Sequence, residues 1–191
     1  MKNEKLNTNE AFLKIIFDCL VRNGVENTTM RMICDATDLT ASSLYYRFKN
    51  KDEIILEASY FGLNSVTREL FWVVAEKINN FQKLFIAFLK NVDARKQSIK
   101  LIYQVLASPK YGDDFKKMAH SAPLVIYKYA LMLSNRLRCL SEEIMPYVGL
   151  TIAVIREYVI WGNRESTKQK LKFIYDKCLA DCCKKQLSRK K

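Results

Sequence analysis

The sequence predicts an all-α fold, and three observations support this prediction. Glycine and proline, which form the turns that β-rich folds need, number only 5 and 3 among the 191 residues. Apolar residues recur at helical spacing along almost the whole chain. Hydrophobic residues make up 49% of the chain, which is ordinary for a packed globular protein. We expect a three-helix N-terminal domain at residues 1–51 and a larger helical domain at residues 52–191.

The first predicted helix is marked at both ends. Asn7, with Glu10 three residues later, resembles a capping box. Gly24 is the kind of residue that follows a helix C-terminus. Between these ends, apolar residues share one helix face: Ala11, Phe12, Ile15, Ile16, Cys19 and Leu20.

Two short helices follow, joined by a tight turn at residues 38–40. Thr28 or Thr29 caps the first of them, because a threonine oxygen can accept from a free N–H group of the first turn. Thr40 caps the second, which covers residues 41–48. A pair of short helices with this spacing is typical of a helix-turn-helix.

The composition of the second short helix favours binding to DNA. Leu44 and Phe48 face inward as anchors, while the other residues are small or polar. A helix of this kind enters the major groove, where small residues permit close approach to base edges. The free N–H groups of helix N-termini can also hold phosphates. The residues expected to face outward are Thr40, Ala41, Ser42, Ser43, Tyr46 and Arg47.

Longer helices are predicted for the rest of the chain. Asn50 and Glu53 form another capping-box pattern, which opens a helix that continues to about residue 79. The last helix is expected to have Ser166 as its cap. Further helices are predicted near residues 81–89, 97–107, 111–120, 123–140, 141–162 and 166–186.

The stretch from Gly24 to Leu56 resembles the DNA-binding domain of the tetracycline-repressor (TetR) family. The shared elements are Gly24, Thr28-Thr29, Ile33-Cys34, Leu39-Thr40, the run from Ser43 to Phe48, and Lys51-Asp52-Glu53. Cys34 stands where the family usually has alanine, and Arg47 where it often has histidine. Arginine still donates to phosphate, and it can also reach a guanine edge.

The resemblance implies a role for each residue of this segment. Three residues would face bases: Ala41, Ser42 and Tyr46. The others would mostly hold phosphates: Thr28, Thr29, Thr40, Ser43, Tyr45, Arg47 and Lys51. Other interpretations stay open, because Thr29 and Thr40 can serve as N-caps alone. Tyr45 can lie half in the core, and Lys51 can be a solvated charge.

The second half of the chain is rich in aromatic residues. The resemblance implies a pocket for a small-molecule effector there, and we expect it among Phe85, Phe88, Tyr103, Tyr127, Tyr158 and Trp161. It also implies a homodimer through the last two long helices. Their broad apolar faces, near residues 143–162 and 166–186, favour such an interface independently. An internal core is the alternative explanation for these faces.

Charge gives little support to DNA binding. The formal net charge of +12 divides into +1 for residues 1–52, +5 for residues 53–164 and +6 for residues 165–191. Half of the excess therefore lies in a lysine-rich C-terminal segment, which a solvated helix face explains. We expect DNA contact to depend on placed hydrogen bonds rather than on a broad basic patch.

Several other functions are not favoured. The polar N-terminus lacks a signal peptide, and no run of 18 apolar residues predicts a membrane span, so we expect a cytoplasmic protein. The six cysteines are expected to be reduced, although Cys178 and Cys182, one helical turn apart, leave a metal or redox role open. The only histidine is His120, and no catalytic motif is present. We predict no enzyme activity, metal or cofactor.

The predicted function is that of a transcriptional repressor. A dimer would bind double-stranded DNA at an inverted repeat and leave it when an effector binds. The alternatives are a helical adaptor, or a DNA-binding regulator whose effector is a partner protein.

Overall fold

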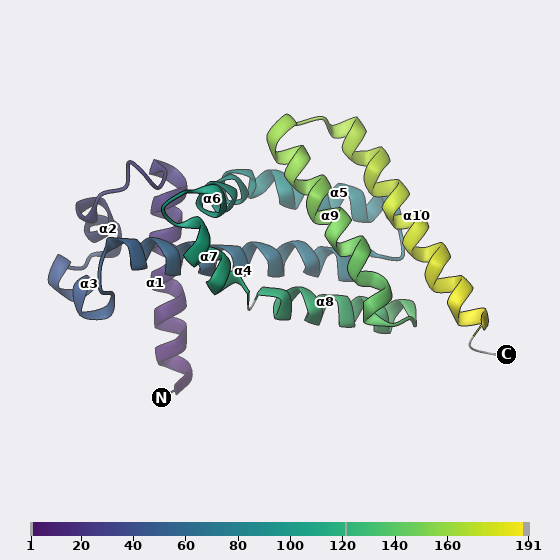
Figure 1. Ribbon diagram of the computed structural model, residues 1–191, viewed down its shortest axis with the longest axis horizontal. Helices are drawn as coiled ribbons and strands as arrows, with labels where there is room; N and C mark the ends of the chain where they lie inside the picture. Colours follow the sequence, from purple (N-terminus) through teal and green to yellow (C-terminus); the bar gives the residue numbers. More distant parts are fainter. Residues whose placement is uncertain (1, 121, 189–191) are drawn as a thin grey trace. The chain divides into compact units, whose positions relative to one another are not determined.

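The structure is a computed structural model that describes residues 2–120 and 122–188. These residues form ten helices and no strand, which confirms the all-α prediction (Figure 1). The helices are α1 (Lys2–Asn23), α2 (Met30–Thr37), α3 (Ala41–Arg47), α4 (Lys51–Lys77), α5 (Phe81–Ala94), α6 (Lys96–Ala107), α7 (Gly112–Ala119), α8 (Ala122–Leu137), α9 (Ser141–Trp161) and α10 (Arg164–Ser188).

The helices belong to two compact units. The first unit holds α1, α2, α3, α4 up to Val66, nearly all of α6, and α7. The second unit holds α4 from Thr67 onward together with α5, α8, α9 and α10. Packing units need not coincide with functional domains, so the domain boundary expected at residue 51 stays a prediction.

The core of the first unit lies between α1 and the helices that follow it. Ile16, Leu20, Ile33, Leu44 and Ile54 are all fully buried there. The crossing of α1 and α4 is close, because a Cβ added at Gly62 would lie 2.2 Å from the Phe17 ring. These contacts fix the short helices α2 and α3, which are too short to be stable alone.

Only the N-terminal end of α1 differs from the prediction. Gly24 ends the helix as expected: its φ is +78°, and its N–H donates to the Leu20 carbonyl at 2.8 Å. The helix begins at Lys2, however, so Asn7 lies inside it and is not its N-cap. A capping-box pattern marks a possible start, but polar residues also continue a helix when nothing interrupts it.

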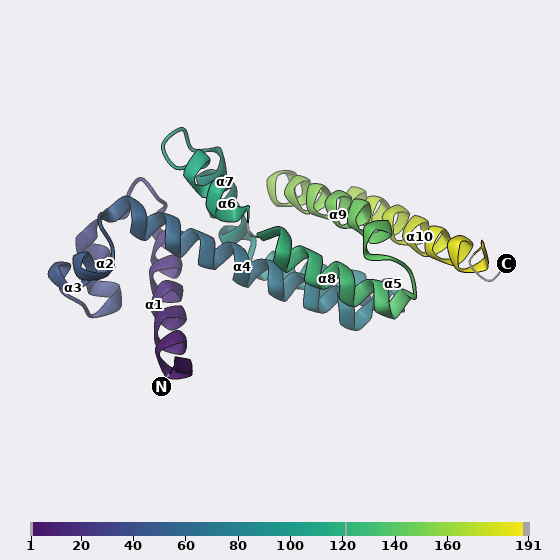
Figure 2. The ribbon, with the colours of Figure 1, turned by 60° about the horizontal axis from the view of Figure 1, so that its bottom comes forward.

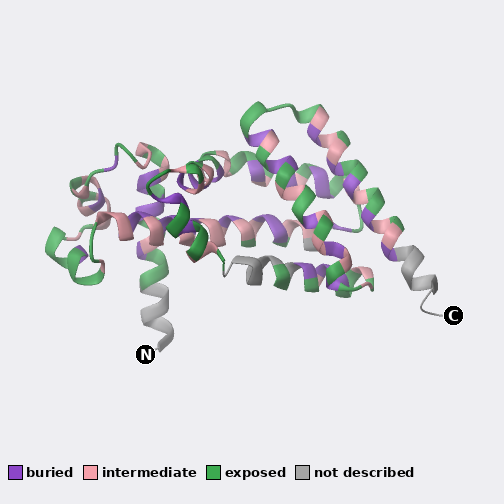
Figure 3. Ribbon diagram, in the orientation of Figure 1, coloured by how far each residue is buried: buried purple, intermediate pink, exposed green. Residues whose placement is uncertain are grey.

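The second unit is organised around α9. Helix α9 lies alongside α10 (Figure 2). It also packs against α8, and α10 contacts α5. Buried residues follow α5 along its length (Figure 3). These buried residues of α5 are Leu84, Phe85, Phe88, Leu89 and Val92.

Caps set the boundaries of the later helices. Asn80 caps α5 by accepting from the Lys83 N–H at 3.0 Å. Asn163 caps α10 by accepting from the Ser166 N–H at 2.9 Å, so the prediction of Ser166 as the cap is wrong. Asparagine is as good a cap as serine and stands three residues earlier, directly after the break at Gly162, where φ is +71°. Helix α8 ends at Leu137 rather than near residue 140, before the left-handed Arg138.

Helix α9 is long and apolar enough to cross a membrane by length and composition. Core helices of soluble proteins meet the same criterion, so the property is weak evidence for a span. Val148, Ile155 and Val159 of this helix are buried against its neighbours.

Candidate nucleic-acid interface and internal cavity

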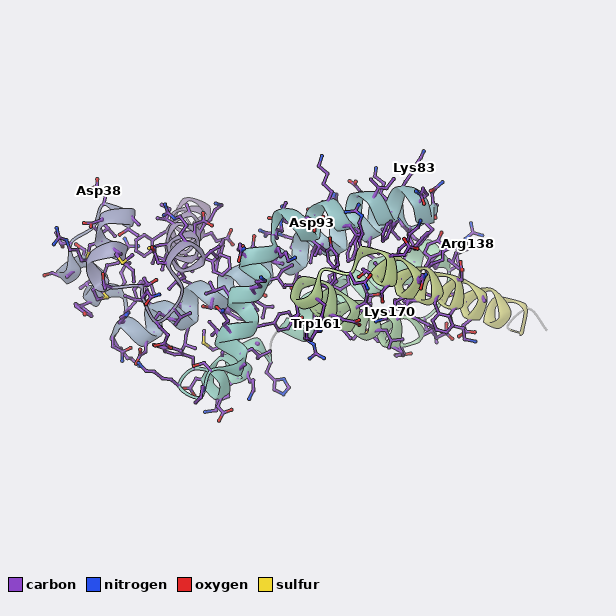
Figure 4. The ribbon with its side chains drawn as sticks, turned by 90° about the horizontal axis from the view of Figure 1, so that it is seen from above. Asp38, Lys83, Asp93, Arg138, Trp161 and Lys170 are labelled. Carbon is purple, nitrogen blue, oxygen red and sulfur yellow. The ribbon has the colours of Figure 1, made fainter. Side chains whose placement is uncertain are left out.

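Helix α2 is bounded by one capping residue at each end. The Thr29 hydroxyl caps α2, where it accepts from the Met32 N–H at 3.2 Å. Asp38 ends α2 in the left-handed conformation, with φ +54°, which short polar side chains tolerate better than most (Figure 4). The chain therefore reverses within a few residues, as a helix-turn-helix requires.

Helix α3 is held by its cap and by one buried side chain. The Thr40 hydroxyl accepts from the Ser43 N–H at 3.2 Å and lies 3.0 Å from the Ser43 hydroxyl. Leu44 is fully buried and anchors the helix on the first unit's core. Thr40 and Ser43 thus have a structural role, while both side chains also remain exposed.

The outer face of α3 is open to solvent. Ala41, Ser42 and Ser43 are exposed, and their small side chains leave the helix N-terminus accessible. Tyr46 is 92% exposed, and Tyr45 is 49% exposed. A tyrosine exposed to that degree gains little from packing, so its position suits contact with another molecule.

Arg47 is the last residue of α3 and packs on an aromatic ring of α1. Its guanidinium lies 5.3 Å from the centroid of the Phe12 ring. Phe12 in turn stacks on Phe48, with 6.3 Å between ring centroids. Because the Arg47 guanidinium stacks on the ring, its position is already restricted while its donors stay exposed. A phosphate contact would therefore cost less side-chain conformational entropy.

Two carboxylates lie beside this end of α3. Glu53 and Glu57 line an open groove together with Tyr46 and Arg47. Burial, and then the charge of Glu53, raises the pKa of Glu57 above its usual value. These acids limit how far along α3 a phosphate backbone can approach.

The start of α4 has the predicted cap. The Asn50 side chain accepts from the Glu53 N–H at 2.9 Å, and the Glu53 carboxylate accepts from the Lys49 N–H. Lys51 is the first residue of the helix and is half-buried. Lys51 therefore stands in the first turn of α4, whose free N–H groups favour an anion.

Asp52 connects this helix start to the loop before α7. Its Oδ1 accepts from Lys110 Nζ at 2.7 Å and from the Tyr111 hydroxyl at 2.8 Å. The Lys110 hydrogen bond, and then that of Tyr111, lowers the pKa of Asp52. The sequence gives no sign of this cluster, because Lys110 and Tyr111 follow Asp52 by 58 and 59 residues.

Thr28 does not belong to the exposed surface. Its side chain is fully buried and donates to the Gly24 carbonyl at 2.6 Å. Its N–H also donates to that carbonyl, at 3.2 Å. The predicted phosphate contact of Thr28 is therefore wrong, because both of its donors are used inside the loop after α1.

A cavity of about 80 Å³ lies inside the second unit. Helices α4, α5, α8, α9 and α10 all contribute to its walls. Phe85 and Phe88, two of the predicted pocket residues, are among the lining residues.

The other four predicted pocket residues do not line this cavity. Tyr158 is buried, but its hydroxyl donates to Asp93 at 2.7 Å. Trp161 is 78% exposed at the end of α9 (Figure 4). Tyr127 is also exposed, and Tyr103 belongs to the other compact unit. Aromatic residues in a helical domain can point to either side, and only their neighbours decide which.

Thiols gather at one end of the cavity. Cys178 is a lining residue, and Cys182 Sγ lies 3.1 Å from Cys139 Sγ. Burial raises the pKa of both Cys139 and Cys178 to about 12, so these thiols are protonated at neutral pH. Among the residues whose side chains the structure describes, no cluster of His, Cys, Asp and Glu fits a metal ion.

Comparison with known proteins identifies a family for the N-terminal segment. The sequence pattern of the bacterial regulatory proteins of the tetR family matches residues 13–58. This match covers the end of α1, all of α2 and α3, and the start of α4. Residues 13–58 therefore have the sequence of a TetR-family DNA-binding domain. The assignment agrees with the resemblance noted from Gly24 to Leu56, and it identifies α2 and α3 as the helix-turn-helix of a DNA-binding regulator.

Similarity in fold to a solved structure extends beyond that match. A crystal structure of a protein proposed to be a transcriptional regulator from Pseudomonas aeruginosa PAO1 is similar, with a TM-score of 0.52. The similarity covers 91% of each chain at 13% sequence identity, which supports the fold alone. A comparison with curated proteins found no match.

Proposed function

We propose that this TetR-family regulator is a cytoplasmic, ligand-responsive repressor. It binds an inverted-repeat operator as a homodimer and leaves the DNA when a small molecule occupies the cavity of the second unit. The observation that carries the proposal is the outer face of α3, where exposed small residues lie beside a tyrosine that is 92% exposed. TetR-family regulators act by binding, and we propose no catalysis for this chain.

The assignment of residues to DNA follows from exposure. Ala41, Ser42 and Tyr46 face the bases of the major groove. The phosphates are contacted by the residues at its rim, namely Thr29, Thr40, Ser43, Tyr45, Arg47 and Lys51. A helix read in this way needs short side chains at its N-terminal end, because its backbone must come close to the base edges.

Dimerisation through α9 and α10 is supported by exposed apolar side chains. Leu150 and Phe173 are 50% and 68% exposed, and they line a shallow groove with Val154 and Ile174. Ile160, on α9, is 58% exposed. A two-fold axis beside these helices would bury the same surface of both copies.

Helix α4 is the element through which the effector acts on DNA binding. It is continuous from Lys51, beside the recognition helix, to Lys77, and Phe71 and Val74 within it line the cavity. An effector shifts the equilibrium only if it binds one arrangement of this helix more tightly than another. The arrangement of α4 that the effector favours changes the spacing between the recognition helices of the two copies, and the DNA is then released.

A selection from random-sequence DNA followed by gel shift tests the DNA-binding half. We expect an inverted-repeat site whose affinity exceeds that of random DNA and falls steeply with salt, because condensed counterions return to the phosphates. The variant Tyr46→Ala should weaken specific binding, whereas the matched control Trp72→Ala, at another exposed aromatic residue, should not. If no selected sequence binds better than random DNA, the proposal is wrong and a protein-binding adaptor takes its place.

A further inference from the structure

None of the described residues that line the cavity of the second unit is charged. The lining residues are Phe71, Val74, Ile78, Phe81, Leu84, Phe85, Phe88, Leu133, Leu137, Ile144, Tyr147, Val148, Thr151, Leu171, Ile174, Tyr175, Cys178 and Leu179. Most of them are aliphatic or aromatic, and the surface they present to the cavity is almost entirely apolar. A ligand inside this cavity must therefore give up most of its contact with water without an ionic partner.

The hydroxyl groups in the described wall belong to Tyr147, Thr151 and Tyr175, and the first two donate within the protein. The Thr151 hydroxyl donates to the Tyr147 carbonyl at 2.8 Å. The Tyr147 hydroxyl donates to Asp181, and this hydrogen bond raises the pKa of Tyr147 to about 12. Both hydroxyls are thus satisfied within the protein, and neither offers a free proton to an anionic ligand.

The charged residues next to the wall are paired with one another. Lys177 lies 3.5 Å from Asp181. Lys172 pairs with Asp176, and its ammonium lies 5.4 Å from the centroid of the Phe81 ring. These four charges therefore balance in two pairs, and they do not favour a cation or an anion in the cavity.

From these observations we propose that the cavity takes small, uncharged and largely apolar molecules, of the size of a single aromatic ring or a short hydrocarbon. The proposal rests on the function proposed above and specifies the chemical class of the effector. An unpaired charge moved from water into apolar surroundings costs far more than an apolar ring gains. Charged analogues of the same shape are consequently excluded.

The size of the cavity sets a further limit. It measures about 80 Å³. An apolar cavity of roughly 150 Å³ in another protein stays dry and binds benzene or xenon. A ring-sized ligand here must therefore displace side chains such as Phe88 or Leu133, and this displacement gives the ligand different affinities for the empty and the expanded arrangement.

Three probes of one shape test the chemical class on the full-length protein. Toluene, benzoate and benzylammonium are titrated separately, and binding is followed by the rise in Tm and by calorimetry. We expect toluene to bind and both ions to bind about 100-fold more weakly or not at all. Equal affinity for either ion, or no toluene binding at all, would overturn the assignment of the class.

Variants locate the site. Val148→Phe fills the cavity from α9, and Ile86→Phe adds the same ring at a residue of α5 that is 52% exposed and does not line it. Toluene binding should be lost in the first variant and kept in the second. Because Val148→Phe can fail to fold, Thr151→Val provides a second measurement: it removes a hydroxyl without changing size, and toluene should bind at least as tightly. Loss of toluene binding in Thr151→Val would contradict an apolar site.

Separate readouts distinguish the class of ligand from the regulatory function. Toluene binding is measured without DNA, and release of the selected operator is measured by gel shift. If toluene binds and the operator stays bound, the cavity assignment holds and its role as the effector site is wrong. If toluene does not bind but another molecule releases the operator, the class is wrong and the repressor function holds.

Discussion

The recognition helix α3 and the cavity of the second unit are built in opposite ways. Helix α3 has seven residues, is capped by Thr40 directly before it, and exposes most of its side chains. The cavity is bounded by five helices from two separate stretches of the chain, α4–α5 and α8–α10, and its walls are apolar. A substitution on a surface built from local contacts can change binding specificity without lowering the stability of the protein. A substitution in the cavity wall removes buried contacts and therefore destabilises the unit.

The largest effect should follow from truncation in the cavity wall. Phe88 is 4% exposed on α5, so Phe88→Ala removes a buried aromatic ring and should lower the free energy of unfolding by about 3–5 kcal/mol. Urea unfolding measures this loss. The control Ile86→Ala lies on the same helix with half of its surface exposed, and it should cost far less. Equal losses of unfolding free energy in Phe88→Ala and Ile86→Ala would mean that burial in the cavity wall does not determine the stability of the unit.

Truncation on α3 should have the opposite result. Tyr46→Ala removes a side chain that is 92% exposed, so the free energy of unfolding should change by less than about 0.5 kcal/mol. The free energy of binding to the selected operator should weaken by about 1–3 kcal/mol, as expected for a residue that contacts bases. The comparison between the two regions fails if Tyr46→Ala destabilises the protein as Phe88→Ala does.

The same contrast explains what the sequence could predict. Thr29, Thr40 and Asn50 cap helices that follow them directly, so their role is visible in a few consecutive residues. The all-α class and the helix-turn-helix rest on such local patterns, and both are confirmed. Thr28 looks like its neighbour Thr29 in the sequence, and only the bend after Gly24 turns its hydroxyl inward.

Non-local contacts were beyond reach of the sequence. Tyr158 and Phe88 are both aromatic residues on helices, yet Phe88 lines the cavity while Tyr158 is directed to Asp93, 65 residues away. The wall residues Leu133 and Ile174 carry no mark that separates them from ordinary core residues. Helical periodicity identifies an inward face, but it does not say which inward residues border an empty space.

The cap of α3 should have an intermediate effect on both properties. Thr40→Ala removes the acceptor for the Ser43 N–H and should lower the free energy of unfolding by about 1 kcal/mol. Thr40→Ser keeps the hydroxyl and should restore stability. Because α3 presents the DNA-binding surface, operator affinity should fall in Thr40→Ala and recover in Thr40→Ser. Thermal unfolding and gel shift measure the two effects, and a stable Thr40→Ala protein would show that tertiary packing alone holds α3.

The smallest effect should come from Asp52. Its hydrogen-bond partners are distant in sequence, unlike those of the capping residues Thr29, Thr40 and Asn50. Hydrogen bonds from Lys110 and Tyr111 lower the pKa of Asp52 below its usual 3.8, so the ionised carboxylate stabilises the folded state. That contribution is present above pH 3.8 and is lost as the pH falls through the folded-state pKa. The side chain is partly exposed, so Asp52→Asn should cost less than about 1 kcal/mol at neutral pH.

Urea unfolding of wild type and Asp52→Asn across this pH range measures the contribution of Asp52. The difference between the two proteins should be constant near neutrality and disappear in acid, since the protonated aspartic acid and asparagine are both neutral. Tyr111→Phe removes one of the two donors and should reduce the difference without abolishing it, because Lys110 still contacts Asp52. A difference that persists at the lowest pH would assign the effect to shape rather than charge, and the loop before α7 would then be held by packing around Tyr111, which is 6% exposed.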